Sequence, residues 1–239
     1  MEEPVKNTWA VWLGLVDYLQ ALELQSRVCE LKKRGFAEDI LLLLEHPPTV
    51  TLGRNGDWQH LLVSDETLRA RGIARYATDR GGDITFHGPG QLVGYPILQL
   101  GRPERDVHRL MLNLEESLIR LLSAYGIEAG REDGLTGVWT RKGKIAAMGI
   151  HISRWITHHG FALNVNTNLS YFDLIVPCGI TGRGIASMQA FLNRTLDLKA
   201  VAESYAGEFS EVFRRKVDWI TIPELDLRLR EYAHKNAVA

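Results

Sequence analysis

The stretch at residues 137–164, GVWTRKGKIAAMGIHISRWITHHGFALN, decides the fold. Three runs in it, residues 137–140, 144–153 and 158–164, are rich in the apolar and aromatic residues that favour strands, and short polar segments separate them. Three strands in close succession favour a sheet whose neighbours are antiparallel.

The rest of the chain adds helices and further strands to this centre. Strands are expected at residues 9–13, 39–45, 49–52 and 73–78, with a hairpin of residues 83–87 and 91–98 around Gly88-Pro89-Gly90. Amphipathic spacing predicts helices at 16–34, 106–125 and 200–216, the first two closed by Gly35 and Gly126. The pattern predicts an α+β fold in which helices cover a mixed, largely antiparallel sheet. We expect a single catalytic domain, residues 1–239, with 196–239 as a C-terminal helical tail.

Composition excludes several classes of protein. The 239 residues are 45% hydrophobic and 24% charged, with a formal net charge of −1, so no whole-chain basic field points to nucleic acid or to an anionic membrane. The N-terminus lacks a basic segment followed by an apolar core, and the longest apolar run, residues 40–44, is far below the ~20 residues that span a bilayer. We therefore expect a cytoplasmic protein, and we expect a monomer because no large exposed apolar stripe demands a dimer.

The two cysteines have different settings. Two cysteines do not make a disulfide framework, which fits a reducing compartment. Cys29 lies inside a predicted helix and is interpreted as structural. Cys178 lies between Pro177 and Gly179, which suit a loop tip, and from this segment alone a nucleophile and a small buried apolar residue are equally good interpretations.

A nucleophilic thiol needs a cation nearby, because its free pKa of about 8.5 leaves only a few per cent ionised at neutral pH. Lys144 begins an apolar strand and is the candidate, although a lysine at a strand end is usually solvated. The glycine-rich segment from Arg80 to Gln91 flanks strand-like residues, with Ile84 and Phe86 expected on one face and Thr85 and His87 on the other. It does not lead directly into a helix, so a phosphate loop is the weaker interpretation.

The histidines are not expected to bind metal. His158 and His159 are adjacent in a predicted strand, where successive side chains point to opposite faces. His87, His108 and His151 have no metal-ligand spacing with them. The sequence therefore predicts no metal site, and we expect no cofactor.

Five segments, in register, are similar to the lipoyl(octanoyl) transferase family. The match runs in order from about residue 40 to about residue 190. Its segments are Glu45-His46-Pro47-Pro48 followed by Thr51-Leu52-Gly53-Arg54, Arg80-Gly-Gly-Asp-Ile-Thr-Phe-His87 with Gly88-Pro89-Gly90-Gln91, Lys144-Ile-Ala-Ala-Met-Gly149, His159-Gly-Phe-Ala-Leu-Asn-Val-Asn166 and Pro177-Cys178-Gly179.

This resemblance implies a fold like that of biotin and lipoate protein ligases. It implies that Cys178 takes an octanoyl group from acyl carrier protein, that Lys144 lowers the pKa of the thiol, and that a lysine of a lipoyl domain then attacks the thioester. The acceptors implied are lipoyl domains of 2-oxoacid dehydrogenase complexes and the glycine cleavage H protein. The substrate-binding residues implied are Arg80, Gly81, Gly82, Asp83, Ile84, Thr85, Phe86, His87, Ala147, Met148, Gly149, Gly160, Phe161 and Ala162.

Physical chemistry adds two expectations. Small residues in the 147–149 and 160–162 segments can line a slot for the acyl chain, whose burial is worth about 5 kcal/mol. A basic rim for an acidic carrier protein is expected from Arg80, Arg141, Lys142, Arg154 and Arg183. Two other functions stay open, an ATP-dependent lipoate or biotin ligase of the same fold and a non-catalytic acyl-carrier binding module.

Overall fold

A mixed eight-stranded sheet forms the centre of the computed structural model, which describes residues 6–179 and 182–235 and, at Cys178, the backbone alone. The strand order is β11-β1-β2-β6-β10-β9-β8-β7. β11, β1 and β2 are parallel and all other neighbours antiparallel, as the sequence predicts. The strands are β1 (Lys6–Leu15), β2 (Asp39–Glu45), β6 (Gln91–Ile97), β7 (Gly130–Glu132), β8 (Leu135–Thr140), β9 (Gly143–Ser153), β10 (Ile156–Asn164) and β11 (Arg215–Trp219).

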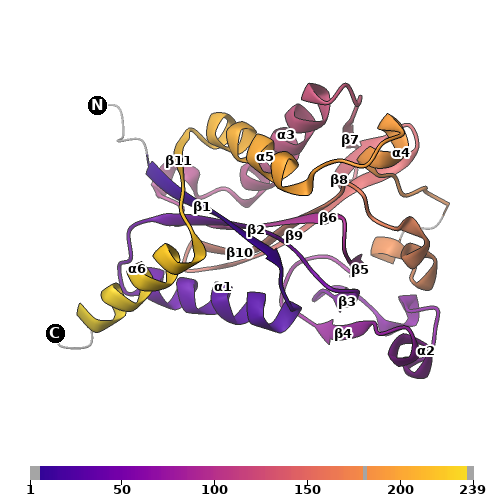
Figure 1. Ribbon diagram of the computed structural model, residues 1–239, viewed down its shortest axis with the longest axis horizontal. Coiled ribbons are helices and arrows are strands. Elements are labelled where there is room, and N and C mark those ends of the chain that lie inside the picture. The colour runs from indigo at the N-terminus through magenta and orange to yellow at the C-terminus, as the bar shows by residue number, and fades with distance from the viewer. Residues whose placement is uncertain (1–5, 180–181, 236–239) are drawn as a thin grey trace.

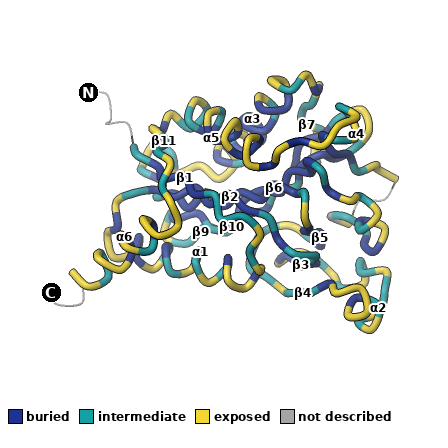
Figure 2. The backbone as a smooth tube through the Cα atoms, viewed as in Figure 1, coloured by how far each residue is buried: buried dark blue, intermediate teal, exposed yellow. Residues whose placement is uncertain are grey.

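Helices cover both faces of this sheet (Figure 1). α1 (Tyr18–Lys33) and α6 (Ile222–Lys235) lie on one face, and α3 (Val107–Ala124) and α5 (Leu198–Phe213) on the other. This arrangement explains the unbroken aliphatic run of β2. Ile40, Leu42 and Leu44 pack towards α1 and α6, while Leu41 and Leu43 pack towards α3 and α5. Figure 2 shows the buried backbone concentrated along the sheet between the two helical layers.

A second, three-stranded sheet lies beside the first and carries part of the site. Its order is β4-β3-β5, with β3 (Thr49–Leu52), β4 (Ala74–Ala77) and β5 (Ile84–His87), and α2 (Asp65–Ala70) packs next to it. The expected hairpin around Gly88-Pro89-Gly90 is wrong, because β5 pairs with β3 while β6 pairs with β2 and β10. The turn passes the chain from one sheet to the other, and Glu45 Oε2 accepts a 2.6 Å hydrogen bond from the amide of Gly90.

Short helical segments complete the connections. They are α4 (Met188–Leu192) and the 3₁₀ turns η1 (Trp58–His60), η2 (Arg102–Glu104), η3 (Leu169–Leu174) and η4 (Pro177–Gly179). Within residues 6–179 and 182–235, no helix is both long and apolar enough to cross a membrane.

The C-terminal part departs from the expected helix at residues 200–216. α5 ends at Phe213, Arg214 takes a left-handed conformation with φ of 51°, and β11 follows and pairs with β1. Arg215 is buried, and its guanidinium donates to Asp39 Oδ2 and to Glu104 Oε1, both at 2.7 Å. Asp39 also pairs with the buried Lys32 at 2.8 Å. A carboxylate shared by two buried cations therefore ties β11 to β2 and α1.

Replacement of Arg215 by methionine should lower the free energy of unfolding by about 3 kcal/mol, because it removes one of the two buried cations that neutralise Asp39. Equilibrium urea unfolding measures the change. The control is Arg230→Met, which removes an exposed pair with Asp226 and should cost no more than about 0.5 kcal/mol. Equal effects of the two substitutions would contradict the role given to Arg215.

Candidate active site

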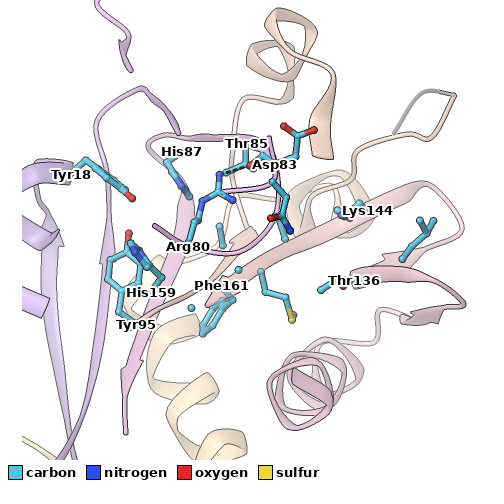
Figure 3. A pocket seen from close by; sticks show the side chains of 18 of the residues that line it. Tyr18, Arg80, Asp83, Thr85, His87, Tyr95, Thr136, Lys144, His159 and Phe161 are labelled. Carbon is cyan, nitrogen blue, oxygen red and sulfur yellow. Dashed lines mark hydrogen bonds between the residues drawn. The ribbon is translucent and has the colours of Figure 1, made fainter. Parts of the chain in front are cut away.

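A cavity of about 370 Å³ opens where β9 and β10 of the large sheet face the segment that leads into β5 (Figure 3). Its wall is mostly apolar on the side of the large sheet and polar on the side of the small one. The lining residues are Tyr18, Asn55, Arg80, Gly82, Asp83, Thr85, His87, Tyr95, Gly134, Leu135, Thr136, Lys144, Ala147, Met148, Gly149, His159, Gly160, Phe161 and Ala162. Such a cavity suits a short apolar chain with a polar end.

Three predicted binding residues do not line this cavity. Ile84 and Phe86 are fully buried on the opposite face of β5, where they pack in the small core with Phe172 and Leu174. The alternation expected for this segment is therefore confirmed, and it directs Thr85 and His87 to the cavity. Gly81 lies in the loop, and its amide donates to the carbonyl of Ile150 at 2.9 Å.

Two glycines in the cavity wall are required by close backbone packing. A Cβ atom on Gly149 would lie 2.4 Å from the carbonyl oxygen of Gly81, and one on Gly160 would lie 2.1 Å from that of Gly94. Both distances are far inside van der Waals contact, and the neighbours are backbone atoms that cannot turn away. These glycines therefore let the loop and β6 approach β9 and β10.

The guanidinium of Arg80 holds the loop to the small sheet. Arg80 is only 8% exposed, and its Nη2 donates to the carbonyl of Thr51 and to that of Asp83, both at 2.7 Å. Nη1 donates to the carbonyl of Gly81 at 3.0 Å. The expectation that Arg80 belongs to a basic rim is therefore wrong, because its guanidinium is buried and donates to backbone carbonyls.

A chain of hydrogen bonds fixes His87 in one neutral tautomer. Its Nδ1 lies 3.0 Å from Gln91 Oε1, an acceptor, so Nδ1 carries the proton, and Nε2 accepts from the hydroxyl of Thr51 at 3.2 Å. Burial, together with the charge of nearby Arg80, holds the pKa of His87 well below its usual value. Gln91 also donates to Asn164, whose amide donates to the carbonyl of Ala186.

Tyr18, Tyr95 and His159 gather at the end of the cavity opposite Lys144 (Figure 3). Sequence reasoning missed the two tyrosines. His46 lies behind them; its Nδ1 donates to the carbonyl of Val16 and its Nε2 accepts from the hydroxyl of Tyr95, each at 2.7 Å. Burial lowers the pKa of His46 to about 4, so this pair is neutral. Tyr18 and Tyr95 come from segments with no motif, and only the fold brings them to the cavity.

Lys144 lies in the cavity wall at the start of β9. It is 6% exposed, so the interpretation as a solvated strand end does not hold, and its Nζ lies 4.8 Å from the centre of the Trp139 ring. Its amide donates to the carbonyl of Gly184 and its carbonyl accepts from the amide of Ala186, both at 2.9 Å. The segment that follows the Cys178 loop therefore runs beside Lys144.

The Cys178 loop reaches the same place from the other side. Pro177 and Lys144 both line a small cavity adjacent to the main one. The amide of Val176 donates to the carbonyl of His60 at 2.7 Å, and a Cβ on Gly179 would lie 2.8 Å from Asp83 Oδ2. The side chain of Cys178 lies outside the described part of the structure, so its distance to Lys144 stays a prediction.

His60 is a further residue that sequence reasoning missed. Its Nδ1 lies 2.5 Å from Asp83 Oδ2, and Asp83 Oδ1 accepts from the amides of Ile84 at 2.6 Å and Asp57 at 3.3 Å. The His60–Asp83 pair thus lies directly against the Cys178 loop. His60 belongs to no motif, and its partner Asp83 lies in a different segment, so nothing in the sequence indicates that the two residues pair.

Cys29 serves as the internal comparison. Its thiol lies 3.8 Å from the carbonyl of Thr157, and burial raises its pKa to about 11. The thiol is therefore protonated at neutral pH, which suits the structural role expected for it.

The expectation that His158 and His159 point to opposite faces is wrong. Their ring centres are 4.2 Å apart, and the two rings and Asp79 offer ligand atoms within 4.8 Å of one another. The physical reason is the backbone of His159, whose φ of 62° is left-handed and interrupts the alternation of the strand. Burial lowers the pKa of His158 to about 4 and also lowers that of His159.

Comparison with known proteins identifies the class. Residues 17–210 match the family model of the lipoyl protein ligase A/B catalytic domain. Among solved structures, a bipartite lipoate protein ligase with its E2 lipoyl domain from Thermoplasma acidophilum superposes with a TM-score of 0.73 at 19% identity, covering 95% of this chain and 91% of the ligase. Lipoate-protein ligase A bound with ATP gives 0.70 at 18% identity, covering 95% and 94%. The fold is thus that of the lipoate ligases.

Curated relatives narrow the identification. The octanoyltransferase of Solibacter usitatus is 53% identical over 209 residues, covering 87% of this chain and 94% of the relative. That of Koribacter versatilis is 49% identical over 213 residues, covering 87% and 85%, and that of Caldicellulosiruptor saccharolyticus is 45% identical over 217, covering 90% and 92%. The chain therefore belongs to the lipoyl protein ligase A/B catalytic-domain family and, within it, to the octanoyltransferases, which are acyltransferases. The resemblance seen in the sequence motifs is confirmed.

The glycine contacts predict opposite effects for two matched substitutions. Gly160→Ala should destabilise the protein by about 1–3 kcal/mol, because its Cβ meets the Gly94 carbonyl. Gly207→Ala lies in α5 with no atom within 4 Å of the new Cβ and should stabilise by about 0.5–1 kcal/mol. Thermal and urea unfolding of both variants measure this, and a neutral Gly160→Ala would show that β6 and β10 can separate without cost.

Proposed function

We propose that this octanoyltransferase carries the octanoyl group as a thioester on Cys178, between acyl carrier protein as donor and a lysine of a lipoyl domain as acceptor. The observation that carries the proposal is that Lys144, the apolar part of the cavity and the Cys178 loop meet at one place. Lys144 is buried in the wall of an apolar cavity, and Pro177, the residue before Cys178, lines the adjoining cavity with it.

Two acyl transfers make up the proposed reaction. In the first, the Cys178 thiolate attacks the thioester carbonyl of the donor, and the carrier sulfur leaves as a thiolate that takes a proton from water. In the second, the neutral amine of the acceptor lysine attacks the Cys178 thioester, the cysteine sulfur leaves as the thiolate that began the cycle, and the nitrogen loses a proton to water as the amide forms. Sulfur suits both steps because it is a good nucleophile and a good leaving group, and the two bulky partners can bind in turn.

Lys144 is proposed to keep Cys178 in the thiolate form. An ammonium group within a few ångströms of a thiol favours its ionised form, and the effect is larger where water is excluded. The burial of Lys144 against Trp139 supports this role. Its backbone bonds to Gly184 and Ala186 hold it next to the loop that follows Cys178.

The apolar half of the cavity is proposed to hold the octanoyl chain. Ala147, Met148, Phe161 and Ala162 supply an apolar surface of small and large side chains. The Arg80 loop, with Asp83 and Thr85, forms the polar wall where the thioester end would lie. The reaction is placed in the cytoplasm, because a reactive thiol needs a reducing compartment.

The ATP-dependent ligase of the same fold has less support. The ligase bound with ATP is 18% identical to this chain and shows the fold alone, whereas relatives at 45–53% identity are octanoyltransferases. Transfer from octanoyl-acyl carrier protein without ATP distinguishes the two functions.

Intact-mass analysis after incubation with octanoyl-acyl carrier protein tests the thioester. The wild-type chain should gain the mass of one octanoyl group, and hydroxylamine should remove it. The adduct should be present in Cys29→Ser and absent in Cys178→Ala. Full acyl transfer by Cys178→Ala, or transfer that requires ATP, would contradict the mechanism.

Removal of the Lys144 ammonium should raise the pKa of the Cys178 thiol towards its free value of about 8.5. Alkylation of Cys178 by iodoacetamide near neutral pH should then slow by about tenfold or more in Lys144→Ala. Lys142→Ala is the matched control, because Lys142 is an exposed lysine two residues away whose Nζ donates to the carbonyl of Ala190. Equal rates in the wild type and Lys144→Ala would remove Lys144 from this role.

We propose a basic rim for the carrier that consists of Arg141, Lys142 and Arg183. Arg141 and Lys142 lie on the exposed β8–β9 turn next to Lys144, and Arg183 pairs with Glu132 there. Arg154 is excluded because it lies beyond the other end of β9, a strand of 11 residues. The double substitution Arg141→Gln with Lys142→Gln should raise the KM for the acyl carrier about threefold or more, with a weaker salt dependence. Arg154→Gln should leave both unchanged; a KM that rises equally in the two variants would refute the rim.

A further inference from the structure

Three histidines surround one carboxylate on the outer side of the cavity wall. His159 Nε2 lies 2.7 Å from Asp79 Oδ1, His151 Nδ1 lies 3.7 Å from Asp79 Oδ2, and His158 Nδ1 lies 4.0 Å from Asp79 Oδ1. We call these four residues the histidine cluster. The proposed acyl transfer uses none of His151, His158 or Asp79.

The fold brings the cluster together from β9, β10 and the loop before Arg80. His151 and His158 are directly opposite each other in the antiparallel pair β9–β10, so their side chains share one face. The left-handed backbone of His159 turns its ring to the same side. Asp79 comes from the loop that leads to Arg80, and its side chain is 45% exposed.

Imidazole nitrogens with a carboxylate oxygen are the donor set of zinc and related divalent transition metals. Ligand atoms bound to one Zn²⁺ at about 2.0–2.2 Å lie roughly 3.4 Å apart in a tetrahedron. The ligand atoms of Asp79, His158 and His159 lie between 2.7 Å and at most 4.8 Å apart, a range that includes this value.

One further observation favours an ion at this position. A cavity of about 200 Å³ leads to Asp79, His151 and His158 from outside, past α1. Lys33 also lines that cavity, and its ammonium is paired with Glu30 at 2.6 Å.

We propose that Asp79, His158 and His159, with His151 as a fourth donor, bind a divalent transition-metal ion of the zinc class. The ion would join the loop before Arg80 to β10. Since His159 also lines the acyl cavity, occupancy would hold one end of that cavity rigid. The expected role is structural, because His159, the cluster residue that lines the acyl cavity, lies at the end opposite Lys144.

Metal titration of the full chain tests the site. The protein carries Cys178→Ser, so that the nucleophile cannot supply a ligand, and is first stripped with a chelator. Equilibrium dialysis against Zn²⁺ should give one bound equivalent, Co²⁺ should give visible ligand-field absorption, and either ion should raise Tm. Absence of a bound equivalent would overturn the proposal.

Single substitutions locate the ion. Loss of even an outer partner of a ligand costs about 10- to 100-fold in metal affinity, so His158→Ala should weaken Zn²⁺ binding by at least about tenfold. His108→Ala, an exposed histidine on α3, should leave the affinity unchanged. Cys29→Ser should also leave it unchanged, although Cys29 lines the outer cavity. Binding that persists in His158→Ala, or that requires His108 or Cys29, would overturn the assignment.

A measurement without a cluster substitution guards against a variant that fails to fold. Zn²⁺ should protect His151 and His158 from modification by diethyl pyrocarbonate, read by peptide mass spectrometry, while His108 and His234 stay reactive. Equal modification of the cluster with and without Zn²⁺ would overturn the site even if the protein binds the ion elsewhere.

Discussion

The buried guanidinium of Arg80 is the interaction on which the site depends. It donates to backbone carbonyls on both sides of the loop and to Thr51 in the small sheet, so the loop cannot move without breaking charge-assisted bonds. Two consequences follow. Thr51 in turn donates to His87 and sets its tautomer, and the loop backbone packs on Gly149 so closely that no side chain fits there. The interactions of the Arg80 loop therefore fix both the polar wall of the cavity and the position of β9.

The large sheet, which helices cover on both faces, forms the other half of the site. β9 and β10 lie deep in it, and their small residues open a cavity that the helices cannot fill. The Cys178 loop is held before the cysteine by the His60 carbonyl and after it by the 184–186 segment, which bonds to Lys144. Contacts on both sides of Cys178 therefore restrict the positions that this loop can take.

Strand runs and helix ends were readable from local pattern. β2 matches the expected residues 39–45, and the first two predicted helices agree with α1 and α3 to within two residues at each end. Pairing was not readable: residues 83–87 and 91–98 look like a hairpin because a glycine–proline turn joins them, yet each run pairs with a strand from elsewhere. β11 was missed because a left-handed Arg214, not a glycine or proline, ends α5.

The sequence by itself determined the chemistry of this protein: an ordered set of motifs placed it among the octanoyltransferases and marked Cys178 and Lys144 as the pair to test. Only the tertiary structure decided which side chains meet. In the structure Ile84 and Phe86 lie in the core, and Arg80 is buried although its charge suggested the surface. His60 pairs with Asp83, which lies in a different segment. The tertiary structure also brought His158 and His159 to one side. The reason is that residue type and spacing encode local backbone preference, whereas burial and contact depend on how distant segments pack, and a single left-handed residue can reverse a side chain's direction.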